Sequence, residues 1–124
     1  MSDIKAYGEI YAATLGLSAT TEVIHDPIQK VRAQFWGGGE SQSWIELIEP
    51  AGEDSPVWRA CKKGGGLDHL CYETPDIERT LEESMVKGGA IVRPLVSAVA
   101  FGGRRIAFVY FLELGLIEFV ESAP

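Results

Sequence analysis

The chain has 124 residues, 46% hydrophobic and 23% charged, which suits one domain or two small modules that share a core. A net charge of −7 without a basic stripe argues against nucleic acid and membrane surfaces as partners. No apolar run reaches the roughly 18–20 residues of a membrane span, and the first ten residues lack the apolar core of a signal peptide. We therefore expect a cytoplasmic protein with reduced cysteines, in which Cys71 is a small core residue.

The first fifty residues predict a helix followed by three strands. Apolar residues at a spacing of three to four predict a helix over Ser2–Leu15, and Gly16 ends it. Three strands are predicted after this helix, at Thr20–Ile24, Lys30–Trp36 and Trp44–Ile48. Turns are predicted between them, at His25-Asp26-Pro27 and at Gly37–Gly39. Residues 51–66, which end in three glycines, are predicted as a linker.

The second half predicts one more strand than the first. A strand over Leu67–Glu73 is followed by a helix to about Lys87, with Thr74 as its N-cap and Pro75 in its first turn. Three strands then complete the chain, at Ala90–Val96, Arg104–Tyr110 and Leu116–Glu121. The order is therefore α-β-β-β followed by β-α-β-β-β.

Two local matches indicate that the halves are copies of one module. Ile45–Glu49 resembles Ile117–Glu121 at an offset of 72, and the Asp-Ile pairs before the two helices recur at an offset of 73. We predict a first module over residues 1–50, the linker over 51–66 and a second module over 67–124, all within one structural domain. The counterpart of Leu67–Glu73 would precede the first helix, so we expect the first module to lack its first strand.

Three polar residues interrupt apolar strand faces. His69 alternates with Leu67 and Cys71, while Glu118 and Glu46 occupy matching positions in the last strands of the two modules. A buried carboxylate is costly unless it is paired, protonated or bound to a cation, so we expect the three side chains to meet. One imidazole and two carboxylates suit a divalent transition metal. The alternative is that each is an exposed or hydrogen-bonded residue without a metal.

Two segments carry a family resemblance. Residues 64–70 with Thr74–Ile77, and residues 102–108 leading into Leu116–Phe119, resemble methylmalonyl-CoA epimerases and glyoxalase I-like proteins. These belong to the vicinal oxygen chelate superfamily, which also includes bleomycin resistance proteins and dioxygenases. The resemblance implies an α+β fold in which two tandem βαβββ modules form an open, cup-shaped mixed sheet with the helices outside.

The resemblance also implies a set of metal ligands. The ligands fall on His69, Glu46 and Glu118, and the ion would be a divalent metal such as Co, Ni, Mn, Zn or Fe. A further family ligand, a histidine of the first strand, has no counterpart in this chain. The epimerase glutamate base falls near Ala33 or Gln34, neither of which moves a proton, so Glu118 is the candidate catalytic base.

Two functions are compatible with these features. The first is a metal-dependent isomerase or lyase that stabilises an enolate of a small oxygenated substrate or its thioester. The second is a metal-free protein that sequesters drugs or other small molecules. The candidate substrate-binding residues in either case are Trp36, Trp44, Phe108, Tyr110 and Arg104. The incomplete first module leaves a strand edge unpaired, so we also predict a homodimer with exchanged or intermolecular strand pairing.

Overall fold

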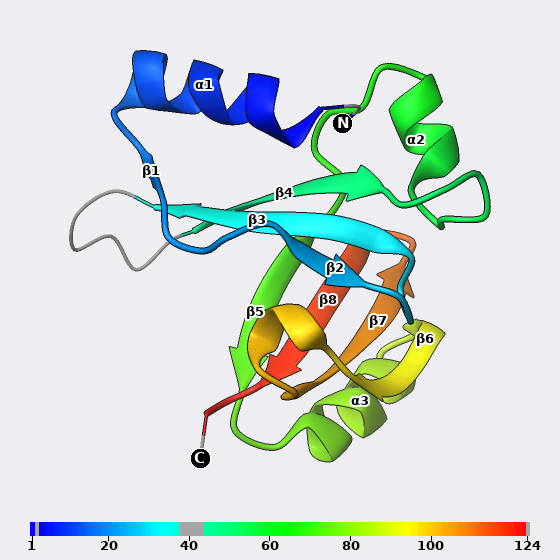
Figure 1. Ribbon diagram of the computed structural model, residues 1–124. Helices are drawn as coiled ribbons and strands as arrows, with labels where there is room; N and C mark the ends of the chain where they lie inside the picture. Colours follow the sequence, from blue (N-terminus) through cyan, green and yellow to red (C-terminus); the bar gives the residue numbers. More distant parts are fainter. Residues whose placement is uncertain (2, 38–43, 124) are drawn as a thin grey trace. The chain divides into compact units, whose positions relative to one another are not determined.

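The computed structural model describes residues 1, 3–37 and 44–123 (Figure 1). The chain forms two compact units, Met1–Gly66 and Leu67–Pro124. The glycines predicted to complete a turn after Gly37 lie outside the described residues. No described helix is long and apolar enough to cross a membrane.

The first unit consists of a helix, a small sheet and a second, short helix. Its elements are α1 (Ile4–Leu15), β1 (Ser18–Ala19), β2 (Ile24–Asp26), β3 (Val31–Gly37), β4 (Ile45–Pro50) and α2 (Trp58–Lys62). Helix α1 begins where the Asp3 side chain accepts a hydrogen bond from the amide of Ala6, and it ends at Gly16 with φ of 66°. Helix α2 lies within the segment predicted as a linker.

Strand β3 is the centre of the first sheet. It pairs antiparallel with β1, β2 and β4, and Ala33 lies opposite Ile24 on one side and Ile48 on the other. Among the described residues, β3 is the one strand that pairs with β4. Near the other edge of β4, the Met1 ammonium group donates a hydrogen bond of 3.0 Å to the carbonyl of Ile48.

The prediction of a single strand at Thr20–Ile24, followed by a turn at His25, was wrong. Two short strands, β1 and β2, replace it, and His25 lies within β2. The cause is Asp26, whose buried carboxylate accepts hydrogen bonds of 3.0 Å from the amides of both Ile28 and Gln29. These bonds place the turn after Asp26 rather than at it.

The second unit has the complete βαβββ order. Its elements are β5 (Leu70–Thr74), α3 (Ile77–Val86), β6 (Ala90–Ser97), the 3₁₀ turn η1 (Val99–Phe101), β7 (Arg105–Phe111) and β8 (Gly115–Glu121). The strand order is β5-β8-β7-β6, in which β5 runs parallel to β8 and the other pairs are antiparallel. Two four-stranded sheets and few helices confirm the α+β class.

Helix α3 covers one face of the second sheet. Ile77 and Leu81 of the helix pack on Ala107 and Val109 of β7. Alternation along β7 sends Ile106 and Phe108 to the opposite face, where Ile106 packs with Val120 of β8. The second sheet therefore has a helix-covered face and a face on which β8 also presents Glu118.

Two local predictions in the second unit were wrong. The N-cap of α3 is Asp76, which accepts from the amide of Arg79, while the Thr74 hydroxyl bonds with Thr80 at 2.6 Å. Cys71 is exposed rather than buried in a core. It lies on β5, an edge strand of its sheet, where four of the five residues are exposed.

Candidate metal centre

The second unit brings His69 and Glu118 into direct contact. Strand β5 pairs in parallel with β8 so that Cys71 lies opposite Glu118, and His69 lies two residues before Cys71. The Nε2 atom of His69 is 2.9 Å from Oε1 of Glu118. Both side chains are almost fully buried, with exposed fractions of 7% and 4%. The expectation that these two residues converge therefore agrees with the structure.

Asp68 holds the imidazole from its other side. Its Oδ2 atom is 2.7 Å from Nδ1 of His69, so the ring lies between two carboxylates. A carboxylate that accepts the Nδ1 proton leaves Nε2 free to bind a metal and fixes the ring orientation. Sequence reasoning did not single out Asp68. The feature of the sequence that could have identified Asp68 is its position directly before a candidate histidine ligand.

The two carboxylates favour a positive charge on His69. Burial favours the neutral imidazole, but hydrogen bonds and charge interactions with Asp68 and Glu118 outweigh it and raise the pKa of His69 to about 9. The hydrogen bond from His69 in turn holds the pKa of Asp68 below its usual range. The cluster is thus arranged to hold a cation between the buried carboxylate of Glu118 and the more exposed carboxylate of Asp68.

Phe108 forms an apolar wall of the pair. It lies directly opposite Glu118 in the register of β7 and β8. Its ring meets the His69 ring edge to face, with centroids 5.0 Å apart and an interplanar angle of 75°. Phe108 was predicted as a substrate-binding residue, and it contacts the imidazole itself.

Glu46 belongs to the first unit. It lies in β4 opposite Phe35 and is half-buried. The Ile-Glu-Leu-Ile-Glu sequence of β4 therefore occupies the same place, on the strand paired with β3, that Ile117–Glu121 occupies beside β7. Its role as a metal ligand stays a prediction.

The remaining predicted substrate-binding residues have different surroundings. Trp44 and Tyr110 are 57% and 45% exposed. Arg104 forms an ion pair of 2.8 Å with Glu73 and donates hydrogen bonds to the carbonyls of Phe101 and Glu121. Its guanidinium therefore already has oxygen partners within its own unit.

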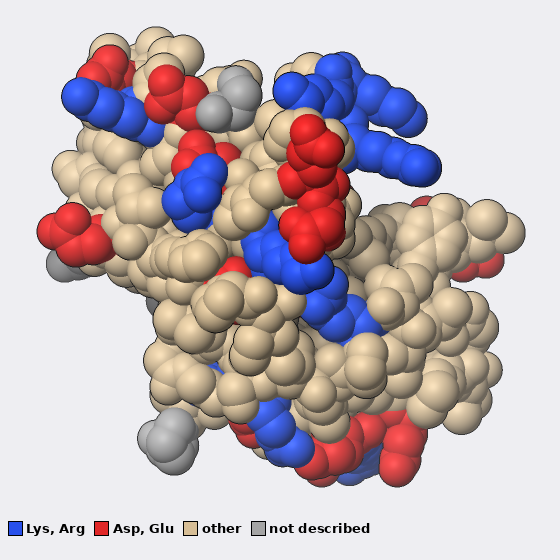
Figure 2. All heavy atoms as spheres, turned by 45° about the vertical axis from the view of Figure 1, so that its right-hand side comes forward, with Lys and Arg blue, Asp and Glu red and all other residues tan. Residues whose placement is uncertain are grey.

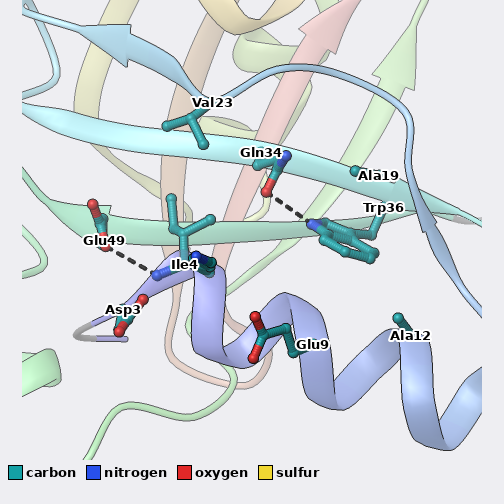
Figure 3. A pocket seen from close by; sticks show the side chains of 10 residues that line it. Asp3, Ile4, Glu9, Ala12, Ala19, Val23, Gln34, Trp36 and Glu49 are labelled. Carbon is teal, nitrogen blue, oxygen red and sulfur yellow. Dashed lines mark hydrogen bonds between the residues drawn. The ribbon is translucent and has the colours of Figure 1, made fainter.

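Trp36 lines a separate hollow in the first unit, of about 580 Å³, beside α1 and β3 (Figure 3). Its indole Nε1 donates to Oε1 of Gln34 at 3.2 Å, as the dashed line in Figure 3 marks. Across the hollow, Glu49 accepts from the amide of Ile4 at 3.0 Å and pairs with Arg32. The bond between Ile4 and Glu49 joins α1 to β4, while the bond between Trp36 and Gln34 lies within β3.

A divalent cation fits the donors of the His69 cluster. An imidazole nitrogen and a carboxylate oxygen converge within 2.9 Å in a buried place, and both are donors that transition metals accept. A βαβββ unit with such a pair on the face opposite its helix defines the vicinal oxygen chelate class of proteins.

The chain belongs to the Glyoxalase/Bleomycin resistance protein/Dioxygenase superfamily, whose family model matches residues 1–108. Among curated proteins it is similar to the mitochondrial methylmalonyl-CoA epimerase of Dictyostelium discoideum, with 27% identity over 88 residues, 68% of this chain and 52% of the relative. The human mitochondrial methylmalonyl-CoA epimerase is 26% identical over 126 residues, covering 97% of this chain and 67% of the relative. The chain thus spans about half to two thirds of the length of these relatives.

Two solved structures share the fold closely. Methylmalonyl-CoA epimerase from Mycobacterium tuberculosis has a TM-score of 0.86 and 26% identity, covering all of this chain and 83% of that protein. A hypothetical protein from Bacillus halodurans has a TM-score of 0.85 and 28% identity, covering all of this chain and 89% of that protein. The predicted superfamily is therefore confirmed.

Proposed function

We propose that this chain is a metal-dependent isomerase or lyase that acts on a small oxygenated substrate, including a thioester, through an enolate. The observation that carries the proposal is the buried contact between Nε2 of His69 and Oε1 of Glu118. A histidine braced by Asp68 and facing a buried carboxylate suits metal ligation better than packing, because an apolar pair would fill the same space without desolvating charges.

We assign the ligands to His69, Glu118 and Glu46. Support for Glu46 comes from its place in β4, which matches that of Glu118 in β8. Carboxylates at equivalent positions of two copied modules suit a site to which both modules contribute. Three protein ligands leave coordination positions open for substrate or water.

The residues of the chain have separate tasks in this chemistry. A bound divalent metal supplies Lewis acidity toward two neighbouring substrate oxygens. Glu118 takes the proton from the carbon beside the substrate carbonyl and returns it, as a positioned carboxylate base. Asp68 fixes the His69 ring, and the Phe108 ring keeps water away from one side of the pair.

Metal content tests the ligand assignment. Purified protein would be stripped with chelator and titrated with Co, Ni, Mn, Zn and Fe(II), with calorimetry and thermal unfolding as readouts. We expect stoichiometric binding that His69→Ala and Glu118→Ala abolish and Glu46→Ala weakens. The matched control is Glu73→Ala, an exposed glutamate on β5. Absence of metal binding in the unmodified chain would refute the proposal.

Proton exchange tests the chemistry. The metal-loaded chain would be incubated in D₂O with a panel of 2-substituted acyl thioesters, and loss of the α-proton signal would be followed by NMR. We expect exchange that Glu118→Gln removes. If instead organic ligands stabilise the chelator-treated chain and no proton exchanges, the function is metal-free sequestration.

We also propose that the chain is a homodimer in which β4, which pairs with β3 alone among the described strands, pairs at its other edge with a strand of the other copy. Unpaired strand edges favour such contacts. Light scattering between one and one hundred micromolar tests this, and a monomer over that whole range would contradict it.

A further inference from the structure

The hollow beside Trp36 lies on the side of the first sheet that α1 covers, within the first unit (Figure 3). Its volume of about 580 Å³ is in the range of sites that bind small organic molecules. Phe35 lies opposite Glu46 and shares its face of the sheet, while Gln34 and Trp36, the neighbours of Phe35 along β3, project to the other face. The hollow is therefore separate from the metal ligand proposed in this unit.

Trp36 gives the hollow a rigid aromatic wall. Its ring is half-buried and rests against Gly8 of α1, where a side chain would overlap it. The indole Nε1 donates to Gln34 at 3.2 Å, and Gln34 in turn donates to the carbonyl of Thr21 at 3.0 Å. A ring that is already held in place loses little freedom when a ligand packs on it, which favours binding. The remaining apolar lining comes from Ile4, Ala12, Ala19 and Val23.

The charged lining of the hollow is mainly acidic. Asp3, Glu9 and Glu49 contribute carboxylates, and Lys5 is the only basic residue among the described residues that line it. Most Lys and Arg residues of the first unit lie elsewhere, and Figure 2 shows such side chains gathered where α2 lies. The charge around the hollow therefore favours a cation over an anion.

Glu9 is the carboxylate that remains available for a ligand. Asp3 is the N-cap of α1. Glu49 accepts a hydrogen bond from the amide of Ile4 and pairs with Arg32. The exposed Glu9 side chain forms no hydrogen bond or ion pair with any residue that the structure describes. Figure 3 shows Glu9 on α1 and Trp36 on the sheet, so a ligand in the hollow can contact both.

We propose that this hollow binds a small aromatic amine, whose ring packs against Trp36 and whose ammonium group meets Glu9. Aromatic rings pack on one another, and both an indole and a carboxylate attract an ammonium group. A metal ion would leave the apolar walls of the hollow unused, and a neutral apolar molecule would leave the Glu9 carboxylate unpaired. The site goes beyond the proposed function and does not depend on it, because all of its residues lie in the first unit and away from the face of Glu46.

Titration of the full chain with 2-phenylethylamine tests the proposal, with chelator present throughout so that the metal centre does not contribute. NMR of the backbone and indole amides follows binding. We expect saturable shifts of the Trp36 indole signal and of amides in α1. Phenylethanol lacks the charge, while ethylamine and Ca²⁺ lack the ring, so each of these three probes should bind at least about threefold more weakly.

Four variants locate the site. Glu9→Gln should weaken the binding of 2-phenylethylamine by roughly two- to fivefold, and Trp36→Leu by about the same factor. Lys5→Gln removes a like charge and should strengthen binding by up to about twofold, an effect that a purely structural role would not produce. The matched control is Glu53→Gln, an exposed glutamate of the same unit that does not line the hollow, and its affinity should be unchanged. Thermal unfolding confirms that each variant is folded.

The proposal fails if the unmodified chain shows no saturable shifts at amine concentrations up to about 10 mM. It also fails if the shifts are confined to residues outside the hollow. Phenylethanol or ethylamine that binds as tightly as 2-phenylethylamine would overturn it, because the charge or the ring would then contribute nothing. Equal affinity in Glu9→Gln and in the Glu53→Gln control would overturn it as well, and this comparison does not depend on Trp36→Leu, because both glutamates are exposed.

Discussion

The contact between His69 and Glu118 predicts a large coupling energy in the metal-free chain. Both side chains are more than nine-tenths buried. His69→Ala removes the imidazole that contacts the buried Glu118, and Glu118→Ala leaves His69 with Asp68 as its remaining carboxylate partner. The perturbation is a double-mutant cycle made of His69→Ala, Glu118→Ala and the double variant, with chelator present throughout.

The magnitude follows from the pKa of His69. Its rise from 6.5 to about 9, at about 1.36 kcal/mol per pKa unit, corresponds to a stabilisation of about 3 kcal/mol. Because the folded pKa is raised, this stabilisation is fully present below pH 6.5 and is lost as pH rises through about 9. Asp68 contributes part of it, so the coupling to Glu118 alone should be about 1.5–3 kcal/mol at pH 6 and less at pH 10.

Urea unfolding of the four proteins at pH 6 and pH 10 measures the coupling directly. The control is the same cycle on Arg79 and Glu83, an exposed pair of 3.0 Å with side chains 73% and 67% exposed. That pair should give about 0.5 kcal/mol or less at both pH values. A His69–Glu118 coupling below about 1 kcal/mol at pH 6, or equal at pH 6 and pH 10, would refute the reasoning.

Three further predictions concern stability and are measured by urea unfolding. The Cβ of Gly8→Ala would overlap the Trp36 ring, so this substitution should lower the free energy of unfolding by about 1–3 kcal/mol. The same substitution usually stabilises a helix, so a stabilising effect here would contradict the contact between Gly8 and Trp36. Hydrogen bonds from Arg105 hold the pKa of Glu121 below 4.5, so the free energy of unfolding should fall as pH drops below that value. Arg105→Gln should make this fall less steep. Parallel plots of stability against pH for the two proteins would argue against the Arg105–Glu121 pair. Ile106→Ala removes a fully buried side chain and should cost about 2–5 kcal/mol, and a cost under about 1 kcal/mol would mean that the site is not a packed core.

Much of the fold could be predicted because its periodic patterns are long and locally consistent. The α3 helix and the three strands after it were placed to within a residue or two, since glycines and apolar alternation bound them. The short strands β1 and β2 could not, because the buried Asp26 sets their turn through hydrogen bonds that no spacing pattern reveals. Exposure of Cys71 was also missed, because an edge strand shows the same alternation as a central one.

The candidate site could be predicted in part. His69 and Glu118 were recognised because each interrupts an apolar face, and the parallel register of β5 and β8 brings them together. Asp68 was missed although it directly precedes His69 in the sequence, because adjacency alone does not show that the carboxylate turns toward the imidazole ring. Arg104 was assigned to substrate because its pairing with Glu73 joins residues far apart in sequence.

The edge of β4 away from β3 limits which strand can be added there. Its sequence, Ile-Glu-Leu-Ile-Glu-Pro, carries two carboxylates and ends in a residue that has no amide proton to donate. Two β4 edges laid side by side would bring like charges together, which disfavours a dimer joined through two β4 strands. The strand that joins β4 should therefore differ from it and run parallel, as β5 does beside β8. Assembly stops at a dimer when a two-fold axis makes this contact reciprocal, because a contact between unlike surfaces that does not close continues into a filament.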